Sequence, residues 1–411
     1  MFAALSTALS ALNGQSTAID VIGNNLANLN TTGFKASSVA FHDLVAESLG
    51  TSQTQVGFGI GRPLTLRHFS QGAIETSTSP LACAIQGDGF LIVKDSNNNT
   101  LYTRDGNLQI DKDGTLKTAT GQRIQGWTGL SGNVNVNGPV GDINIPAGSL
   151  KSPVATTDVT LDINLNSSAT AGTPGGTFTT SLDVFDSLGT SQTLTFTFTK
   201  SATPNAWDYA VTSPNGTVAV TPATGTLQFD SSGNLQTPSA TTAAPIIGIT
   251  GLTNGASDMN ITWNLFDSGL GEITQFAQTS ALSANTQNGS ASSELTNVTM
   301  GDNGAVIARY SNGQQSVVGQ LATASILNPE SLVSVGNNEF QTSAQSAAPA
   351  IGLPGTGQRG TLLGGSLEAS VVDIAKEFTS LILLQRGYQA NAKIITTVDD
   401  MSQQTINMKR D

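Results

Sequence analysis

Residues 366–410 read SLEASVVDIAKEFTSLILLQRGYQANAKIITTVDDMSQQTINMKR, and this stretch decides the fold. Apolar residues recur in it at alternating spacings of four and three, the pattern of a coiled-coil seam. Ser366 is a suitable N-cap, Glu368 lies in the positively polarised first turn, and no proline interrupts the run. We therefore expect one helix of about 40 residues, roughly 60 Å long. Nine of its twelve inward positions are apolar, and the twelve are Leu367, Val371, Ile374, Phe378, Leu381, Gln385, Tyr388, Ala392, Ile395, Asp399, Ser402 and Ile406.

The N-terminal end of the chain carries the matching half of this seam. Its apolar residues fall in the same frame, at Leu5, Leu9, Leu12, Ile19 and Leu26. Polar residues interrupt the apolar run too often for a membrane span. A cleavable signal would require a basic residue near the N-terminus, and no Lys or Arg precedes Lys35. We expect the two termini to pair as helices, so that everything between them is a long insertion.

Composition and charge narrow the class of protein. The 411 residues suggest two to four domains, and 11% charged with 5% aromatic residues is low for a cytosolic enzyme. Between residues 152 and 308 the only basic residue is Lys200, against eleven acidic ones, which accounts for −10 of the net charge of −12. An acidic middle without a basic patch argues against nucleic acid and against anionic membranes as partners.

The interior of the chain reads as β-structure. Strict alternation in TLTFTFTK, residues 193–200, predicts a half-buried strand, and turn signals recur every few residues elsewhere. We therefore expect a mixed, mainly β fold, with two sandwich-like or barrel-like β domains inserted between the paired helices. The predicted division is a terminal helical domain (1–30 and 366–411), a connecting segment (31–70 and 356–365), an inner β domain (71–145 and 278–355) and an outer acidic β domain (146–277).

Residues that could carry chemistry are few. Cys83 is the only cysteine, so no intramolecular disulfide forms, and its apolar surroundings predict a buried side chain. The two histidines, His42 and His68, have no metal-binding spacing. Asp183 and Asp186 sit close together, but acidic residues beside glycine usually form turns. We predict no enzyme, no cofactor and no metal, with a glycosidase carboxylate pair left open.

Several motifs together carry a family resemblance. NNLANLNTTGFK (residues 24–35) follows the amphipathic N-terminus, and GSLEASVVDIAKEFTSLILLQRGYQANAKIITTVDDM (residues 365–401) opens the C-terminal stretch. Both resemble the axial proteins of the bacterial flagellum. DVFDSLG, TLTFTFTK, ITQFA, RYSNGQ and GLPGTG in the interior resemble the hook proteins within that group. The motif residues that carry the terminal resemblance are Asn24, Asn25, Asn28, Gly33, Phe34, Arg386, Gly387, Tyr388 and Asn391.

The resemblance implies a structural subunit rather than an enzyme. Copies would polymerise into a curved, flexible tube outside the cell that transmits motor torque as a universal joint. The implied partners are other copies of the chain, rod subunits, the hook cap, the hook–filament junction proteins and the flagellar type III export apparatus, with export in the absence of a cleavable signal. A distal rod subunit is the alternative of the same class, and a secreted β-rich adhesin is the alternative of a different class.

The terminal helices would be the part that polymerises. Their seam is marginal for so long a helix pair, so we expect it to be frayed in a monomer and to become ordered when neighbouring copies bury its other faces. The residues expected to form the helical core of the polymer are Leu5, Leu9, Leu12, Ile19, Leu26, Ile374, Phe378, Leu381, Tyr388 and Ile395.

Overall fold

The computed structural model describes residues 2–45, 57–129, 134–146, 148, 150–221 and 225–408. The chain divides into two compact units. Unit 1 consists of residues 1–147, 297–309 and 315–411, and unit 2 of residues 148–296 and 310–314. The fold is mainly β, with two curled β-sheet bodies between an N-terminal and a C-terminal helix that contact each other, as the sequence predicted.

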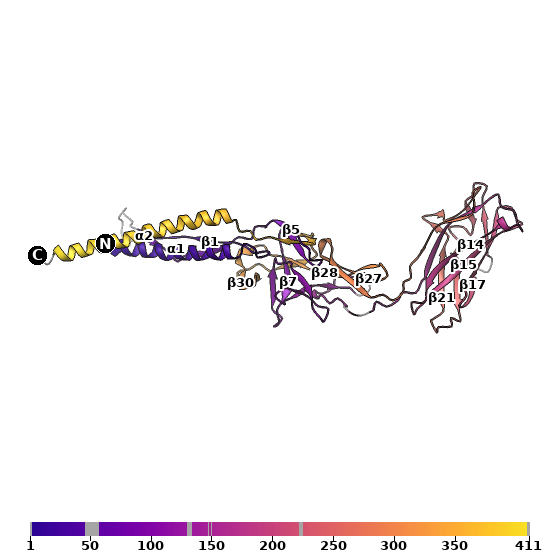
Figure 1. The fold of residues 1–411 in the computed structure, drawn as a ribbon, viewed down its shortest axis with the longest axis horizontal. Coiled ribbons are helices and arrows are strands. Elements are labelled where there is room, and N and C mark those ends of the chain that lie inside the picture. Colours follow the sequence, from indigo (N-terminus) through magenta and orange to yellow (C-terminus); the bar gives the residue numbers. More distant parts are fainter. Residues whose placement is uncertain are drawn as a thin grey trace. The chain divides into compact units, whose positions relative to one another are not determined.

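The two helices of unit 1 lie side by side, and their ends lie near each other (Figure 1). Helix α1 spans Phe2–Ala27 and helix α2 spans Ile374–Met408. The C-terminal helix is therefore long, as expected, but it begins later than predicted. Asp373, not Ser366, is its N-cap, because the Asp373 carboxylate accepts hydrogen bonds from the backbone N–H groups of Ala375 (2.9 Å) and Lys376 (3.1 Å). The side chain of Ile406 and residues 409–411 lie outside the described part.

The first residues of the predicted helix form a strand instead. Strand β34 (Ser366–Glu368) pairs antiparallel with β5 (Ile74–Thr76). Leu367 therefore lies opposite Glu75 in a sheet, and Val371 donates its backbone N–H to Phe34, so both are absent from the helical seam. Sequence periodicity missed this because the β-sheet pairing of Ser366–Glu368 overrides its local fit to the helical frame.

Two short hairpin pairings follow α1 and pack on it; we call them the arm. Strand β1 (Ser37–Ala40) pairs with β4 (Leu64–Arg67), and β2 (Asp43–Val45) pairs with β3 (Gly57–Ile60). The arm reaches α1 closely, since a Cβ added at Gly14 would lie 2.2 Å from Cδ1 of Ile60. The Ser10 hydroxyl also accepts a hydrogen bond from the Ile60 backbone N–H at 3.2 Å.

The β-body of unit 1 is built on one large sheet. Its central order is β26 (Leu295–Met300), β27 (Ala305–Tyr310), β28 (Gln315–Leu321), β11 (Arg123–Thr128), β7 (Phe90–Lys94), β8 (Thr100–Thr103), β31 (Glu339–Gln341) and β30 (Val333–Gly336). Five further strands attach to it: β9 (Leu108–Ile110), β10 (Leu116–Thr118), β12 (Gly141–Asp142), β29 (Thr323–Ser325) and β32 (Ala350–Gly352). A separate pair joins β6 (Cys83–Gln86) to β33 (Thr361–Gly364). The core of this β-body contains edge-to-face contacts among Phe69, Phe90 and Phe340.

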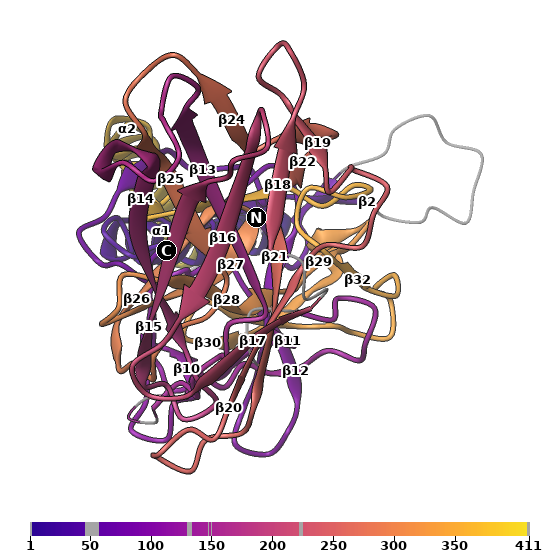
Figure 2. The ribbon, with the colours of Figure 1, turned by 90° about the vertical axis from the view of Figure 1, so that its right-hand side faces the viewer.

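Unit 2 closes two sheets around an aromatic core. One sheet contains β17 (Thr217–Thr221), β20 (Ile246–Thr250), β21 (Met259–Asn264), β13 (Asp158–Asn166), β24 (Ile273–Phe276) and β25 (Ala281–Gln287). The other orders β14 (Thr177–Phe185), β15 (Ser191–Lys200), β16 (Ala206–Thr212), β18 (Thr226–Phe229) and β19 (Leu235–Thr237); β14, β15, β16 and β18 lie side by side in Figure 2. A short hairpin pairs β22 (Phe266–Asp267) with β23 (Leu270–Gly271).

The alternation predicted for residues 193–200 is confirmed in β15. Leu194, Phe196 and Phe198 are fully buried, whereas the threonines between them face outward or are half-buried. Trp263 on β21 packs against Phe196 and Phe198 from the opposite sheet. Strand β25 belongs to this unit through its pairing with β13, so the unit extends beyond residue 277. The finer division into four segments stays a prediction.

Aspartates close several turns of both units. Asp95 accepts hydrogen bonds from the backbone of Asn97 and Asn99, so DSNNNT closes the turn between β7 and β8. Asp230 does the same in unit 2 for Ser232 and Asn234. These hydrogen bonds lower the pKa of both carboxyl groups, that of Asp95 chiefly through the Asn99 side chain and that of Asp230 chiefly through the Asn234 backbone.

Candidate interaction site at the paired termini

Small and polar residues take most of the fully buried positions of α1, whereas most of its large apolar residues are half-buried or exposed. Among the residues of α1 from Leu5 onward, the fully buried ones are Ala8, Gly14, Ala18, Ile22 and Asn25. Ala8, Ala18 and Asn25 each lie one residue before a predicted inward position, and Gly14 faces the arm. The predicted frame for α1 is therefore displaced by one residue. The reason is that α1 packs against both the arm and α2. Its buried face therefore lies between the directions of these two neighbours.

The structure splits the predicted core residues into two groups. Leu5, Leu12, Ile19, Leu26, Leu381 and Ile395 are half-buried. The other four are exposed, by 52% for Leu9, 46% for Ile374, 50% for Phe378 and 42% for Tyr388. On α2 the half-buried positions include Glu377, Leu384, Asn391 and Val398, each one residue before the predicted Phe378, Gln385, Ala392 and Asp399. Ala392 is itself half-buried, whereas Gln385 and Asp399 are exposed.

Polar contacts fix how the two helices are aligned. The Asn391 side chain donates a hydrogen bond to the Gln15 side-chain oxygen at 3.2 Å. Gly387 lies one turn earlier on α2, and a Cβ added there would lie 2.6 Å from the Gln15 Nε2 atom. Two of the predicted motif residues, Gly387 and Asn391, therefore meet the same residue of α1. A polar pair of this kind specifies register at some cost in stability.

Asn25 makes the second polar contact and is 1% exposed. Its side-chain oxygen accepts from the Ser37 backbone N–H at 3.0 Å, and its Nδ2 donates to the Ser37 carbonyl at 2.8 Å. The same Nδ2 donates to the Glu377 carboxylate on α2 at 3.2 Å. Asn25 thus joins α1, β1 and α2, and this explains why an amide is needed at this motif position.

The remaining motif residues shape the end of α1. Asn28 donates its side-chain N–H to the Asn24 carbonyl at 2.9 Å and so caps the last turn. Gly33 has a φ of +65°, and a Cβ there would lie 2.7 Å from the Arg104 backbone, so only glycine fits. Phe34 follows it and is half-buried, and Arg386 is exposed on α2.

A buried ion cluster lies at the base of the helical pair, and the sequence did not reveal it. The Lys35 Nζ lies 2.6 Å from one Glu368 carboxylate oxygen, and Arg104 Nη1 lies 3.4 Å from the other. All three side chains are at most 3% exposed. Burial lowers the pKa of Lys35, and Arg104 lowers it further, against the opposing effect of Glu368.

Backbone groups complete this cluster. Glu368 accepts from the Gly72 N–H at 2.7 Å, and Lys35 donates to the Ser70 carbonyl at 2.6 Å. Arg104 donates to the carbonyls of Gly87 and Gly89, both at 2.9 Å. Charged groups that are buried together need hydrogen-bond partners for their remaining polar atoms in this way. Four stretches of sequence thus converge here: the end of NNLANLNTTGFK, GDGF (residues 87–90), RDGN (residues 104–107) and the start of GSLEASVVDI (residues 365–374).

A signal for the cluster did exist in the sequence. Charged residues make up only 11% of the chain, and Lys35 and Glu368 both stand inside family motifs. The predicted role of Glu368, in the first turn of a helix, is wrong because Glu368 ends a strand instead. A lone charge inside a weakly charged motif is better interpreted as one member of a buried pair.

The residues considered for chemistry are accounted for by structure. Cys83 is buried, and burial, aided by Asp105, raises the pKa of its thiol to about 12. Asp186 closes a turn, as predicted for acidic residues beside glycine, and Asp183 accepts from the Thr193 hydroxyl. Within the described ranges, no group of three or more His, Cys, Asp or Glu side chains is placed to hold a metal ion. Neither described helix combines the length and the apolar character needed to span a membrane.

Family models match four stretches of the chain. They are the flagellar basal body rod protein (residues 5–35), the flagellar hook protein FlgE/F/G D1 domain (84–165), the flagellar basal body protein FlaE D2 domain (170–290) and the flagellar basal body rod FlgEFG C-terminal domain (363–408). The paired termini and the β-bodies between them therefore define a protein of the flagellar rod and hook class.

Relatives matched over their whole length narrow this class. The chain is 32% identical to the flagellar hook protein FlgE of Borreliella burgdorferi, with 100% of both chains covered. It is 31% identical to the FlgE of Escherichia coli K12, over 99% of this chain and 100% of that one. The chain belongs to the flagellar hook protein FlgE family, which is a family of structural proteins and not of enzymes.

A solved structure supports the same fold. The crystal structure of Helicobacter pylori flagellar hook protein FlgE2 matches 73% of this chain and 100% of that one, with a TM-score of 0.50 and 14% identity. At this identity the likeness concerns the fold alone.

Proposed function

We propose that copies of this chain polymerise through α1 and α2 into the curved, flexible tube of the flagellar hook, which transmits motor torque to the filament. One observation carries the proposal. The largest apolar side chains of the helical pair, among them Phe378 and Ile374, are about half exposed although the pair already has a partner helix and an arm. Apolar surface left open on a paired helix requires a further partner.

The partners follow from membership of the family, which implies assembly with flagellar components. We propose that the specific partners are further copies of the chain, the rod subunits, the hook cap and the hook–filament junction proteins. Export would use the flagellar type III apparatus. The surface expected of unit 2 is acidic but carries few charged residues. Such a surface suits outer domains that slide over one another as the tube bends.

Leu381→Asp tests the role of the helices. Leu381 is half-buried on α2, so a carboxylate there is costly in any packed arrangement of helices. We expect the purified variant to form no polymers in electron micrographs, while its far-ultraviolet circular dichroism keeps the β-sheet signal. Leu327→Asp is the matched control, because Leu327 is 81% exposed and lies outside the helices. Normal polymers from Leu381→Asp would contradict the proposal.

A further inference from the structure

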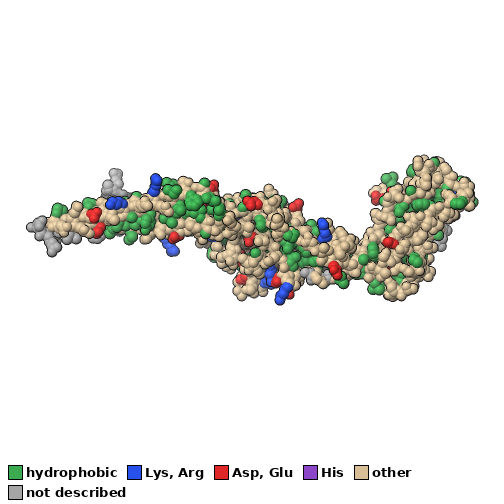
Figure 3. Space-filling model, in the orientation of Figure 1, with side chains coloured by type: hydrophobic (Ala, Val, Ile, Leu, Met, Phe, Trp, Pro, Cys, Tyr) green, Lys and Arg blue, Asp and Glu red, His purple; other side chains and the backbone are tan. Residues whose placement is uncertain are grey.

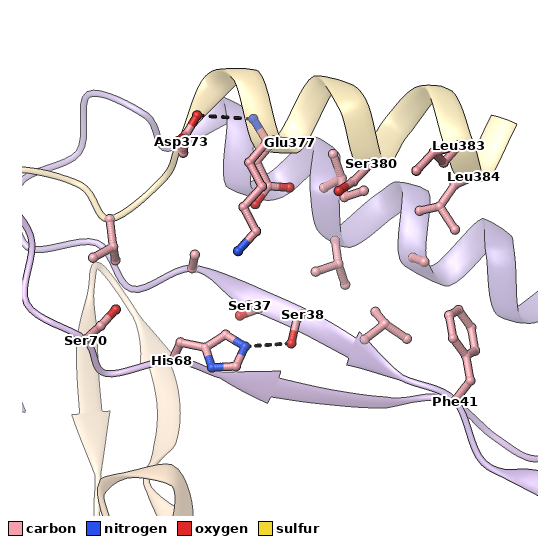
Figure 4. Close-up of a pocket in the computed structure, with 17 residues that line it drawn as sticks. Ser37, Ser38, Phe41, His68, Ser70, Asp373, Glu377, Ser380, Leu383 and Leu384 are labelled. Atoms are coloured by element: carbon pink, nitrogen blue, oxygen red, sulfur yellow. Dashed lines mark hydrogen bonds between the residues drawn. The ribbon is translucent and has the colours of Figure 1, made fainter.

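A groove runs along the helical pair of unit 1. Its volume is about 680 Å³, its floor is α1 at Ala18, Val21 and Ile22, and its two walls are the arm and α2. Figure 4 shows Phe41 of the arm and Leu383 and Leu384 of α2 directed toward it from opposite walls. We call it the helix groove. Its mouth is apolar, since Phe41 is 43% exposed and Leu383 is 66% exposed.

A second apolar surface lies on the other side of α2. Ile374, Phe378 and Ile382 recur every four residues, so they form one stripe along the helix, and Tyr388 lies further along the same broad side, about 40° from Ile374 around the axis. We call these four residues the back face. They are 42–51% exposed, and none of them lines the helix groove. In Figure 3, hydrophobic atoms gather along the helical pair, over both α1 and α2.

Helix geometry places the two surfaces apart. At about 100° per residue, the α1-facing positions Leu384 and Asn391 lie between the back-face stripe and Leu383. The back face therefore looks away from the groove, and the two surfaces cannot meet within one chain. Leu383, Ile394 and Met401 lie on the same side of α2, so exposed apolar side chains continue along that side of the helix beyond the groove.

We infer that the back face of one copy seats in the helix groove of the next copy. This inference rests on the proposed polymer and specifies its helical contact. The groove offers the back face an apolar floor and an apolar rim at Phe41, Leu383 and Leu384, while Asp373, Lys376 and Glu377 line its other end. The back face is in turn a helix stripe with large side chains at a spacing of one turn, the form of partner that apolar grooves take.

Two different surfaces give an assembly that does not close on itself. When the same patch meets its own copy, a dimer forms and growth stops, whereas a groove that takes a different surface leaves both kinds of surface open at the ends. The orientation of the back face away from the groove is therefore what a growing chain of copies requires.

The exposed area also favours a polymer over a stable dimer. With about 150–250 Å² for each large side chain, the four half-exposed back-face residues present roughly 350 Å². A similar area on the groove side would bring one contact to roughly 700 Å² in total, below the roughly 1,200 Å² typical of a stable pair. A copy inside a row of copies makes two such contacts, one through each surface. Copies in the interior of the row are therefore stably bound, whereas an isolated pair, which has a single contact, is not.

Engineered cysteines test which surfaces meet. Phe378→Cys marks the back face, Leu383→Cys marks the groove, and the double variant carries both. The native Cys83 is buried with a thiol pKa of about 12, so it does not react with maleimides at neutral pH. Each protein is polymerised, checked by electron microscopy, treated with a bismaleimide crosslinker and analysed by denaturing electrophoresis. Phe378→Cys combined with Leu327→Cys is the control, because Leu327 is 81% exposed and lies outside the helices and outside both surfaces.

We expect a ladder of crosslinked species from the double variant and monomers from each single variant. A mixture of the two single variants should give dimers and nothing larger, because each copy then offers one cysteine. Dimers from a single variant alone, or no crosslinks in polymers of the double variant, would overturn the back-face contact. Absence of wild-type polymers under every polymerising condition would instead contradict the proposed function.

Discussion

The helical pair of unit 1 and the core of unit 2 bury their side chains in opposite ways. In unit 2 the largest residues, such as Trp207, Trp263 and Phe196, are fully buried and the threonines face outward. In the helical pair most of the fully buried residues are small or polar, such as Ala8, Ala18 and Asn25, with Ile22 as the exception, while Phe378 is half exposed. Unit 2 therefore completes its core with its own chain. The helices leave several of their large apolar side chains about half exposed.

The largest expected effect comes from truncating the self-sufficient core. Trp263→Ala removes a fully buried ring that contacts Phe196, Phe198 and Tyr209. We expect unit 2 to lose about 5 kcal/mol of unfolding free energy, the upper end for such truncations, because the surrounding sheets cannot close the cavity. Urea titration monitored by Trp207 fluorescence measures the loss.

Phe378→Ala is the contrasting truncation on the helices. Phe378 is half exposed, so we expect the unfolding free energy of the monomer to change by less than about 1 kcal/mol. Together the two variants test whether the helical pair and unit 2 differ in how complete their cores are. If Phe378→Ala destabilised the monomer as much as Trp263→Ala, the helices would have a completed core of their own.

The buried ion cluster is expected to show the next largest effect. Glu368→Ala leaves Lys35 and Arg104 buried without their counter-charge, which should cost unit 1 about 3 kcal/mol. Hydrogen exchange by mass spectrometry should show faster exchange in β34 and β5, while peptides from unit 2 stay unchanged. Asp142→Asn is the matched control, because the Arg123–Asp142 pair is 28% and 37% exposed and should contribute less than about 1 kcal/mol. Equal effects of the two variants would show that the cluster does not hold the base of the helices.

Sequence patterns predicted most of the architecture and little of the cluster. The alternation of Leu194, Phe196 and Phe198 is a local signal that burial enforces, so it was confirmed. Seam periodicity found both helices and their contact. Of the residues that it selected on α2, Leu381 and Ile395 are half-buried and Phe378 is exposed. Apolar periodicity gave no sign of the contact that Gln15 makes with Gly387 and Asn391.

The remaining errors concern partners that are distant in sequence. Glu368 meets Lys35 across 333 positions and Arg104 across 264, and no spacing rule links such residues. Ser366–Glu368 fits a helical frame locally, but pairing with Ile74–Thr76 decides its structure. Tertiary pairing overrode local periodicity at both places.

A smaller, pH-dependent effect on stability is expected from a buried carboxylate of unit 2. It tests how much the hydrogen bonds to this carboxylate stabilise the unit. Asp186 is 0% exposed and accepts hydrogen bonds from the Asn254 side chain (2.6 Å), the Gln192 side chain (3.0 Å) and the backbone of Leu188 and Thr190. Burial by itself would raise the pKa of Asp186, but these hydrogen bonds outweigh it and lower the pKa below its usual value. Asp186→Asn should therefore destabilise unit 2 by about 1–3 kcal/mol at pH 7, since an amide cannot accept all of these bonds.

The sign of the pH dependence follows from the lowered pKa of Asp186. Because the folded state holds the carboxylate more strongly than the unfolded chain does, the stabilisation is fully present above the unfolded pKa of about 4 and is lost as the pH falls through the lower folded value. The difference between wild type and Asp186→Asn in urea titrations should thus shrink as the pH falls below about 4. Asp183→Asn, which changes an exposed carboxylate in the same hairpin, should shift stability by less than about 0.5 kcal/mol. A difference that persisted unchanged at acidic pH would mean that Asp186 acts through its shape alone, and that unit 2 does not depend on a sealed charge.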